Sequence, residues 1–208
     1  MLNKHIIICV GRQLGSGGHD IGRMLALDLN AKYYDRELMN LAAKESGLSE
    51  RVFEQHDERK SFLRSFLHLP NGMAGAGYSR QGFSQDSFFQ FQSEAIRKAA
   101  DDSSCVFVGR CADYVLRDRD DVVSVFITAA MDFRIEQVMA KQHFATPQQA
   151  RRFIEQGEAR RADYYNYYTG KRWGEAASYD LCIDSSVLGL AETEKFIADF
   201  VRKRFAAM

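Results

Sequence analysis

Continuous apolar runs recur along the chain and are separated by segments whose apolar residues follow helical spacing. Such runs without alternation are typical of strands buried on both faces of a parallel sheet. The predicted strands are Ile6–Val10, Lys32–Tyr34, Cys105–Val108, Val122–Ile127 and Tyr179–Ile183. Because strands and helices alternate, the sequence predicts an α/β fold with a doubly wound parallel sheet.

The interval 36–103 is long for a connection between two strands. We interpret residues 1–208 as a single domain, because a chain of this length can bury a sizeable core. Two interpretations of 36–103 carry equal weight: an inserted lobe over the edge of the sheet, or an insertion that packs on the partner subunit of a homodimer. The glycine-rich segment 72–77 has too little side-chain bulk to hold one conformation.

A helix in the last third of the chain has a clear start signal. Thr146 suits the N-cap, Pro147 suits the first helical position, and Gln149 completes a capping pattern. The residues that follow, up to Trp173, combine basic side chains with tyrosines. Arginines in such a segment can close over phosphates and exclude water, so we expect a lid at 145–175. A solvated helix face is the alternative.

A glycine-rich segment, Gly11–Asp20 with the sequence GRQLGSGGHD, follows the first apolar run and leads into a helical pattern. Glycines let backbone N–H groups point at an anion, and the start of a helix adds a partial positive charge. This layout predicts a phosphate-binding loop. The pattern G-x-x-x-x-G-K-[ST] is nevertheless not met, because Arg12 replaces its first glycine, Gly18 its lysine and His19 its hydroxyl residue.

Two other interpretations of this loop stay open. Its glycines could serve only the close packing of the strand against the helix. A dinucleotide-binding pattern fits at Gly15 and Gly17 alone, although Asp35 follows the second strand where a ribose-binding acid is expected. A nicotinamide-dependent oxidoreductase is therefore a further alternative.

Several polar side chains beside the loop and the strand ends have the chemistry of phosphoryl transfer. Arg12 can meet the β- and γ-phosphates with two hydrogen bonds from its planar guanidinium. His19 can orient a phosphate or a water molecule. Asp35 suits magnesium through water, and Arg110, after the third strand, suits the phosphate of an acceptor. The alternatives are a solvent-facing Arg12 and an Arg110 that forms a salt bridge with Asp113 or Asp118.

Composition limits the partners and the location. The 28 basic and 28 acidic residues cancel, so no global charge favours nucleic acid or an acidic membrane, and any anion binding must come from local clustering. No apolar stretch approaches the roughly 18 residues of a membrane span. The cysteines show no C-x-x-C spacing, and most of them lie in apolar runs, which indicates a reducing cytoplasm.

Taken together, five motifs resemble the cytidylate kinase-like family of P-loop nucleoside monophosphate kinases. In chain order they are G-R-Q-L-G-S-G-G-H-D-I-G, Y-Y-D-R-E-L, V-G-R-C-A-D-Y-V-L, R-R-A-D-Y-Y-x-Y-Y-T-G-K-R-W and Y-D-L-C-I-D-S-S, and the likeness covers nearly the whole chain. The resemblance implies a three-layer P-loop kinase fold with a parallel five-stranded sheet, a helical lid and an inserted lobe. It also implies ATP and Mg2+ as cofactors.

The resemblance and the chemistry of the loop together give a set of expected site residues. The nucleotide- and phosphate-binding residues are Gly15, Ser16, Gly17, Gly18, His19, Arg134, Asp184 and Ser185. The catalytic residues are Arg12, Asp35, Arg160 and Arg161, and the acceptor-binding residues are Arg36, Gly109 and Arg110. Cys111 stands where true cytidylate kinases have the aspartate of G-R-D, which removes an expected contact with the base.

We therefore hypothesise a cytoplasmic kinase that transfers the γ-phosphoryl group of ATP to a small acceptor, which on the resemblance is a nucleoside monophosphate. Catalysis would consist mostly of positioning and charge stabilisation. The alternative is a nucleotide- or phosphate-binding regulatory module that lost catalysis together with the loop lysine.

Overall fold

The computed structural model describes residues 5–35 and 85–206. Two compact units divide the chain: Met1–Asp35 with Ile96–Met208, and Arg36–Ala95. The second unit begins at the same residue as the predicted inserted lobe, 36–103. The predicted glycine-rich segment 72–77 and the candidate residue Arg36 lie outside the described residues, so the structure of the lobe stays a prediction.

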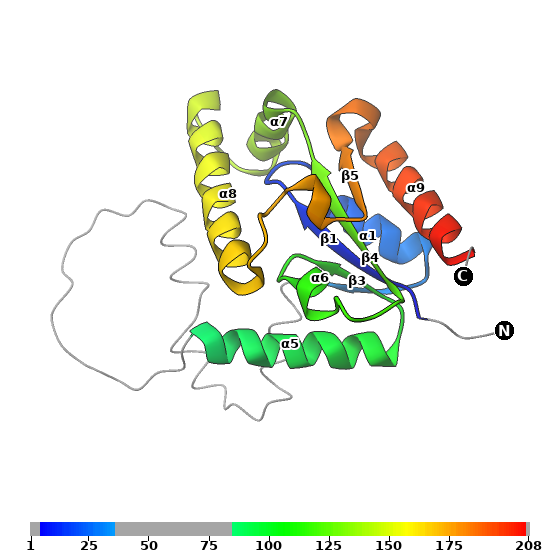
Figure 1. The fold of residues 1–208 in the computed structure, drawn as a ribbon. Coiled ribbons are helices and arrows are strands. Elements are labelled where there is room, and N and C mark those ends of the chain that lie inside the picture. The colour runs from blue at the N-terminus through cyan, green and yellow to red at the C-terminus, as the bar shows by residue number, and fades with distance from the viewer. Residues whose placement is uncertain (1–4, 36–84, 207–208) are drawn as a thin grey trace, which may run out of the picture. The chain divides into compact units, whose positions relative to one another are not determined.

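In the described residues, five parallel strands form one sheet in the order β2-β3-β1-β4-β5 (Figure 1). They are β1 (Ile7–Arg12), β2 (Lys32–Tyr34), β3 (Cys105–Val108), β4 (Val122–Thr128) and β5 (Leu181–Asp184). Each strand overlaps one of the apolar runs in the sequence. The predicted doubly wound parallel sheet is confirmed.

Alternate residues of the strands face two helical layers, as the two-residue period of a strand requires. Ile8 and Val106 belong to the core beneath α1 (Gly18–Asp28) and α9 (Ser185–Ala206). Cys105 faces the other way, and its thiol donates to the carbonyl of Ala99 in α5 (Gln85–Asp102) at 3.2 Å. The short helix α6 (Ala112–Val115) contacts β1 and β4. The buried strands therefore have helices on both faces.

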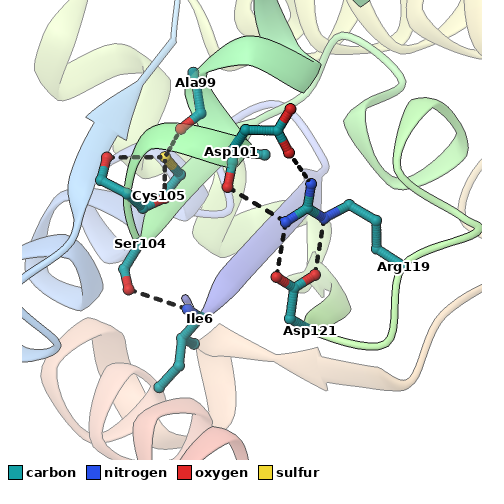
Figure 2. Close-up of polar contacts among 9 residues, drawn as sticks. Ile6, Ala99, Asp101, Ser104, Cys105, Arg119 and Asp121 are labelled. Carbon is teal, nitrogen blue, oxygen red and sulfur yellow. Dashed lines mark hydrogen bonds and ion pairs between the residues drawn. The ribbon is translucent and has the colours of Figure 1, made fainter. Parts of the chain in front are cut away.

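Arg119 fixes the amino end of the sheet, opposite the predicted site (Figure 2). Its Nε and Nη2 each donate to a carboxylate oxygen of Asp121 at 2.8 Å. Its Nη1 also contacts the carboxylate of Asp101, near the end of α5. On the same side of the molecule, the Ile6 amide donates to Ser104 Oγ at 3.0 Å. These contacts join the end of α5 to the starts of β3, β1 and β4.

The remaining helices of the described residues are α7 (Met131–Lys141), α8 (Pro147–Thr169) and the 3-10 turn η1 (Ala176–Ser178). Thr146 Oγ1 accepts from the Gln149 amide at 3.3 Å, so the predicted N-cap of α8 is confirmed. Most of the predicted lid region, 145–175, is this one helix, which ends at Gly170 in the left-handed region (φ 67°). Within the described ranges, no helix combines the length and apolar character needed to cross a membrane.

Candidate functional site: a glycine cradle beside clustered arginines

Residues 13–18, called the cradle below, connect β1 to the start of α1. Gly15 (φ 85°) and Gly17 (φ 73°) adopt the left-handed backbone that favours glycine. Neither position has room for a side chain. A Cβ on Gly15 would lie 2.6 Å from the carbonyl oxygen of Arg134, and one on Gly17 would lie 2.3 Å from Leu190 Cδ2. The glycines that the sequence singled out are thus required by both backbone conformation and close packing.

Hydrogen bonds from neighbouring strands brace the cradle. The Gln13 amide donates to the Ile127 carbonyl of β4 at 3.0 Å. Ser16 Oγ donates to the Gln13 carbonyl at 3.0 Å, and the buried Ser185 Oγ lies 2.7 Å from the Ser16 carbonyl. Ser16 and Ser185, expected to bind nucleotide, therefore hold the loop in shape. Their contact with a nucleotide stays a prediction.

Arg12, at the carboxyl end of β1, crosses from the cradle toward β3. A Cβ on Gly18 would lie 2.5 Å from Arg12 Cβ and 2.9 Å from its Cγ. A Cβ on Gly109 would lie 2.2 Å from Arg12 Nη1. The side chain therefore passes Gly18 and places its guanidinium over Gly109. Burial lowers the pKa of Arg12; Arg110 lowers it further, and the carboxylate of Asp35 raises it.

Arg161 approaches Arg12 from α8. Its Nη1 donates to the Arg12 carbonyl at 3.3 Å. Burial, followed by the guanidinium of Arg12 and then that of Arg110, lowers the pKa of Arg161 to about 9, although Glu158 and Asp35 act in the opposite direction. Three arginines from β1, the loop after β3 and α8 thus influence one another electrostatically. Arg160, the other predicted lid arginine, is exposed.

The loop after β3 has an unusual backbone. Gly109 (φ 82°), Arg110 (φ 63°) and Cys111 (φ 55°) are consecutive residues in the left-handed region. A non-glycine residue held there costs about 1–3 kcal/mol, and such residues cluster at functional sites. Arg110 directly follows Gly109, the glycine beside which the Arg12 guanidinium lies. The sequence predicted Gly109 and Arg110 as site residues, but gave no sign of this conformation.

Arg134 lies on the other side of the cradle. It is buried in α7, and its guanidinium contacts Glu158 of α8 through Nη1. Its Nε is buried without a hydrogen-bond partner among the described residues. Arg134 was expected to hold phosphates. In this structure it joins α7 to α8, and its contact with phosphate stays a prediction.

His19 and Asp35 form a pair at the start of α1. His19 Nε2 lies 2.5 Å from Asp35 Oδ2. Asp20, the next residue of α1, pairs at the same distance of 2.5 Å with Lys141 of α7. The predicted magnesium ligand is therefore engaged by a histidine of the loop. Over the described residues, no group of three or more His, Cys, Asp or Glu side chains is arranged to hold a metal ion.

Asp184, at the end of β5, caps the helix that follows. Its Oδ1 accepts from the amide of Ser186 at 2.8 Å. The first turn of α9 then breaks at Gly189 (φ 76°, ψ 167°), and Leu190 packs against Gly17 of the cradle. Asp184 was expected beside the base of the nucleotide. The structure shows its structural role, and the nucleotide contact stays a prediction.

Asp113 and Tyr165 form a contact that the sequence did not reveal. Tyr165 Oη donates to Asp113 Oδ2 at 2.6 Å and so ties α8 to α6. Burial raises the pKa of Asp113 above its ordinary value, although the Tyr165 hydroxyl acts in the opposite direction. Of the two acids named as salt-bridge candidates for Arg110, Asp113 bonds to this tyrosine and Asp118 pairs with Arg117 at 3.7 Å. Residues 158, 161 and 165 share one face of α8, because they are three and four positions apart.

A parallel sheet of this strand order, with a glycine cradle between β1 and α1, defines a P-loop kinase fold. The chain belongs to the cytidylate kinase-like family, whose model matches residues 7–187. The resemblance noted in the sequence is thereby confirmed. A comparison with the sequences of curated proteins gives no match.

Solved structures support the same fold. An uncharacterized protein from Eubacterium ventriosum is 25% identical, with 95% of this chain and 99% of that chain covered and a TM-score of 0.72. A shikimate kinase from Bacteroides thetaiotaomicron is 14% identical, with 95% and 98% covered and a TM-score of 0.54. A gluconokinase from Sinorhizobium meliloti is 12% identical, with 97% and 93% covered and a TM-score of 0.54. Family and neighbours together support a kinase-like enzyme.

Proposed function

We propose that the protein transfers the γ-phosphoryl group of ATP to a nucleoside monophosphate. The observation that carries this proposal is the gathering of Arg12, Arg110 and Arg161 beside a glycine cradle. Phosphoryl transfer spreads negative charge over the transferred group and requires cations fixed around it. Arg12, Arg110 and Arg161 come from separate elements and would supply this charge beside a loop that has no lysine.

The cradle and the helix it starts would bind the donor. Gly15 and Gly17 shape the turn that leads into α1, and the N-terminus of α1 favours the negative charge of a phosphate. Arg134 lies against the same loop at Gly15, and its Nε has no hydrogen-bond partner in the part of the chain that the structure describes. The loop after β3, with Arg110, would bind the acceptor, since ligands of doubly wound folds lie at the carboxyl ends of the strands.

Asp35 would hold magnesium through water. Mg2+ commonly keeps several waters and uses one or two carboxylates together with substrate phosphates, so a single aspartate at this edge fits the ion. The bound ion supplies charge neutralisation on the phosphates. His19 keeps the Asp35 carboxylate in place at 2.5 Å. Asp35 would thus be positioned before nucleotide binds.

A regulatory module that binds nucleotide without turnover is the second candidate. Two observations favour it. Gly18 stands at the position of the loop lysine, and Asp35, the predicted magnesium ligand, is paired with His19. Such a module would retain the cradle and its arginines for recognition alone. Localisation in the cytoplasm and a homodimer through the 36–103 interval remain predictions.

The discriminating experiment measures ADP production from ATP and Mg2+ with CMP, UMP, AMP and GMP as acceptors. We expect one of these acceptors to stimulate ADP production at least tenfold over ATP alone. Arg161→Gln should lower that rate by about one to two decades, because a charge-assisted hydrogen bond contributes roughly 1.5–3 kcal/mol. Arg152→Gln, on an exposed position of the same helix, is the matched control and should change it less than threefold.

Three results would overturn the proposal. ATP binding without stimulation by any acceptor would favour the regulatory module. Binding of NAD(P) without binding of ATP would favour an oxidoreductase. Equal rates for Arg161→Gln and Arg152→Gln would remove Arg161 from the transfer site.

A further inference from the structure

Arg12 starts in the donor loop but ends at a different strand. Its Cβ and Cγ lie where a side chain at Gly18 would be, and its Nη1 lies where a side chain at Gly109 would be. Gly109 follows β3, and β3 separates β1 from β2 in the sheet. The guanidinium is therefore directed to the β3 side of the cradle. Arg134, by contrast, touches the cradle at Gly15 from α7, which follows β4 on the other side of β1.

We propose that Arg12 binds the phosphate monoester of the acceptor, together with Arg110 and Arg161, and does not replace the missing lysine on the donor phosphates. On this assignment residue 18 is a glycine because the Arg12 side chain occupies the space that a larger residue there would need. This assignment rests on the proposed phosphotransferase function, because it presupposes separate donor and acceptor sites.

The charges around Arg12 favour an anion with two negative charges. Arg12, Arg110 and Arg161 contribute three cations, and each is close enough to another to influence its pKa. Two carboxylates act on these cations, and each is paired. Asp35, which acts on both Arg12 and Arg161, lies 2.5 Å from His19, and Glu158, which acts on Arg161, contacts Arg134. A phosphate monoester is a dianion near neutral pH, and its oxygens accept the paired N–H groups of guanidinium side chains. Its negative charge would offset both the desolvation of the Arg12 and Arg161 guanidinium groups and the repulsion between the arginines.

The backbone after β3 is a second, independent indication of a ligand. Arg110 and Cys111 keep left-handed conformations (φ 63° and 55°) that are unfavourable for residues with side chains. Gly109 has to be glycine, because Arg12 Nη1 lies 2.2 Å from where its Cβ would be. The chain thus keeps a strained turn directly at the Arg12 guanidinium. Ligand contact at this turn would account for the left-handed backbone of Arg110 and Cys111.

Calorimetric titration of the full-length protein with inorganic phosphate tests this assignment. The titration is done alone and again with saturating Mg2+ and a non-hydrolysable ATP analogue, which fills the cradle. We expect the wild type to bind phosphate in both conditions. Arg12→Gln should weaken phosphate binding in the presence of the analogue at least tenfold and change the affinity for the analogue less than threefold. Arg152→Gln is the control and should match the wild type.

Other outcomes overturn the inference. If Arg12→Gln weakens the analogue tenfold and leaves phosphate binding intact, Arg12 serves the donor. Loss of neither, or absence of phosphate binding by the wild type with the analogue bound, also removes the assignment. Should Arg12→Gln fail to fold, Arg12→Lys replaces it, and its phosphate affinity should still fall several-fold because lysine lacks the paired donors. The wild-type titration with the analogue separately reports whether the proposed donor site exists, so the two failures are distinguishable.

Discussion

A side chain at Gly18 has no room beside Arg12. The added Cβ of Gly18→Ala would lie 2.5 Å from Arg12 Cβ and 2.9 Å from Cγ, whereas carbon atoms in contact prefer about 3.5–4.0 Å. Arg12 Cβ is attached directly to the backbone of β1, so it cannot rotate away. Overpacking of this kind costs about 1–3 kcal/mol. Alanine returns less than about 1 kcal/mol in helix propensity, and we therefore expect a net loss of stability.

Urea unfolding followed by circular dichroism measures this loss. A matched control is Gly157→Ala in α8, where the new Cβ would meet, among the described residues outside its own helix, Leu14 Cδ2 at 3.0 Å, the tip of a flexible side chain. The control should be neutral or slightly stabilising. The second arm is a double-mutant cycle with Arg12→Gly, which removes the opposing Cβ. In that background Gly18→Ala should cost less by about 0.5–3 kcal/mol, the range of coupling energies between residues in contact.

Two results would contradict the close approach of Arg12 to position 18. If the effects of Gly18→Ala and Arg12→Gly add within about 0.5 kcal/mol, the two positions do not share one space. If Gly18→Ala is as stable as Gly157→Ala, the close approach of Arg12 is wrong. Either result would show that the Arg12 side chain is not the reason for the glycine at position 18, where the loop lysine is expected.

Two further predictions concern contacts away from the cradle. Tyr165→Phe leaves the half-buried carboxylate of Asp113 without its 2.6 Å donor and should destabilise the protein by about 1–3 kcal/mol in urea unfolding. Tyr167→Phe, at a tyrosine that is 72% exposed, should change stability by less than about 0.5 kcal/mol, and equal effects of the two substitutions would contradict the role of the bond. Arg119 holds the pKa of Asp121 below its ordinary value, chiefly through a hydrogen bond, so the pair stabilises the fold above the unfolded pKa of about 3.9 and this contribution is lost as the pH falls through the lower folded value. Arg119→Gln should therefore be less stable than the wild type at pH 7 by about 1–2 kcal/mol, and the gap should narrow as the pH falls below about 4. A gap that does not narrow with falling pH would show that packing, and not charge, is lost.

The strands and the cradle could be predicted because their signals are local. A buried parallel strand is a run such as Cys105–Val108, and its position follows from the apolar side chains alone. The start of α8 was likewise readable, since Thr146 accepts from a residue three positions away. The glycines Gly15 and Gly17 signalled a special backbone, and both have positive φ.

The side-chain partners could not be predicted, because they depend on residues far apart in the sequence. Nothing near Arg134 indicates that it meets Glu158, and nothing near Asp113 indicates Tyr165. The direction of Arg12 is a similar case. A residue at the end of a strand can turn to either neighbouring strand, and the packing of Gly18 and Gly109 around this side chain decides it only in three dimensions.

The arginines around Arg12 also bear on whether the loop is the remnant of a lost activity. Burying Arg12 and Arg161 close together opposes folding, as the lowered pKa of each side chain shows. The left-handed turn at Arg110 adds a second unfavourable feature at the same place. A loop that only joined β1 to α1 would need neither. Residues with a strained backbone and ionisable groups with shifted pKa values cluster at functional sites. A glycine therefore stands at the lysine position because the Arg12 side chain, which is directed toward β3, occupies the space that a side chain there would need.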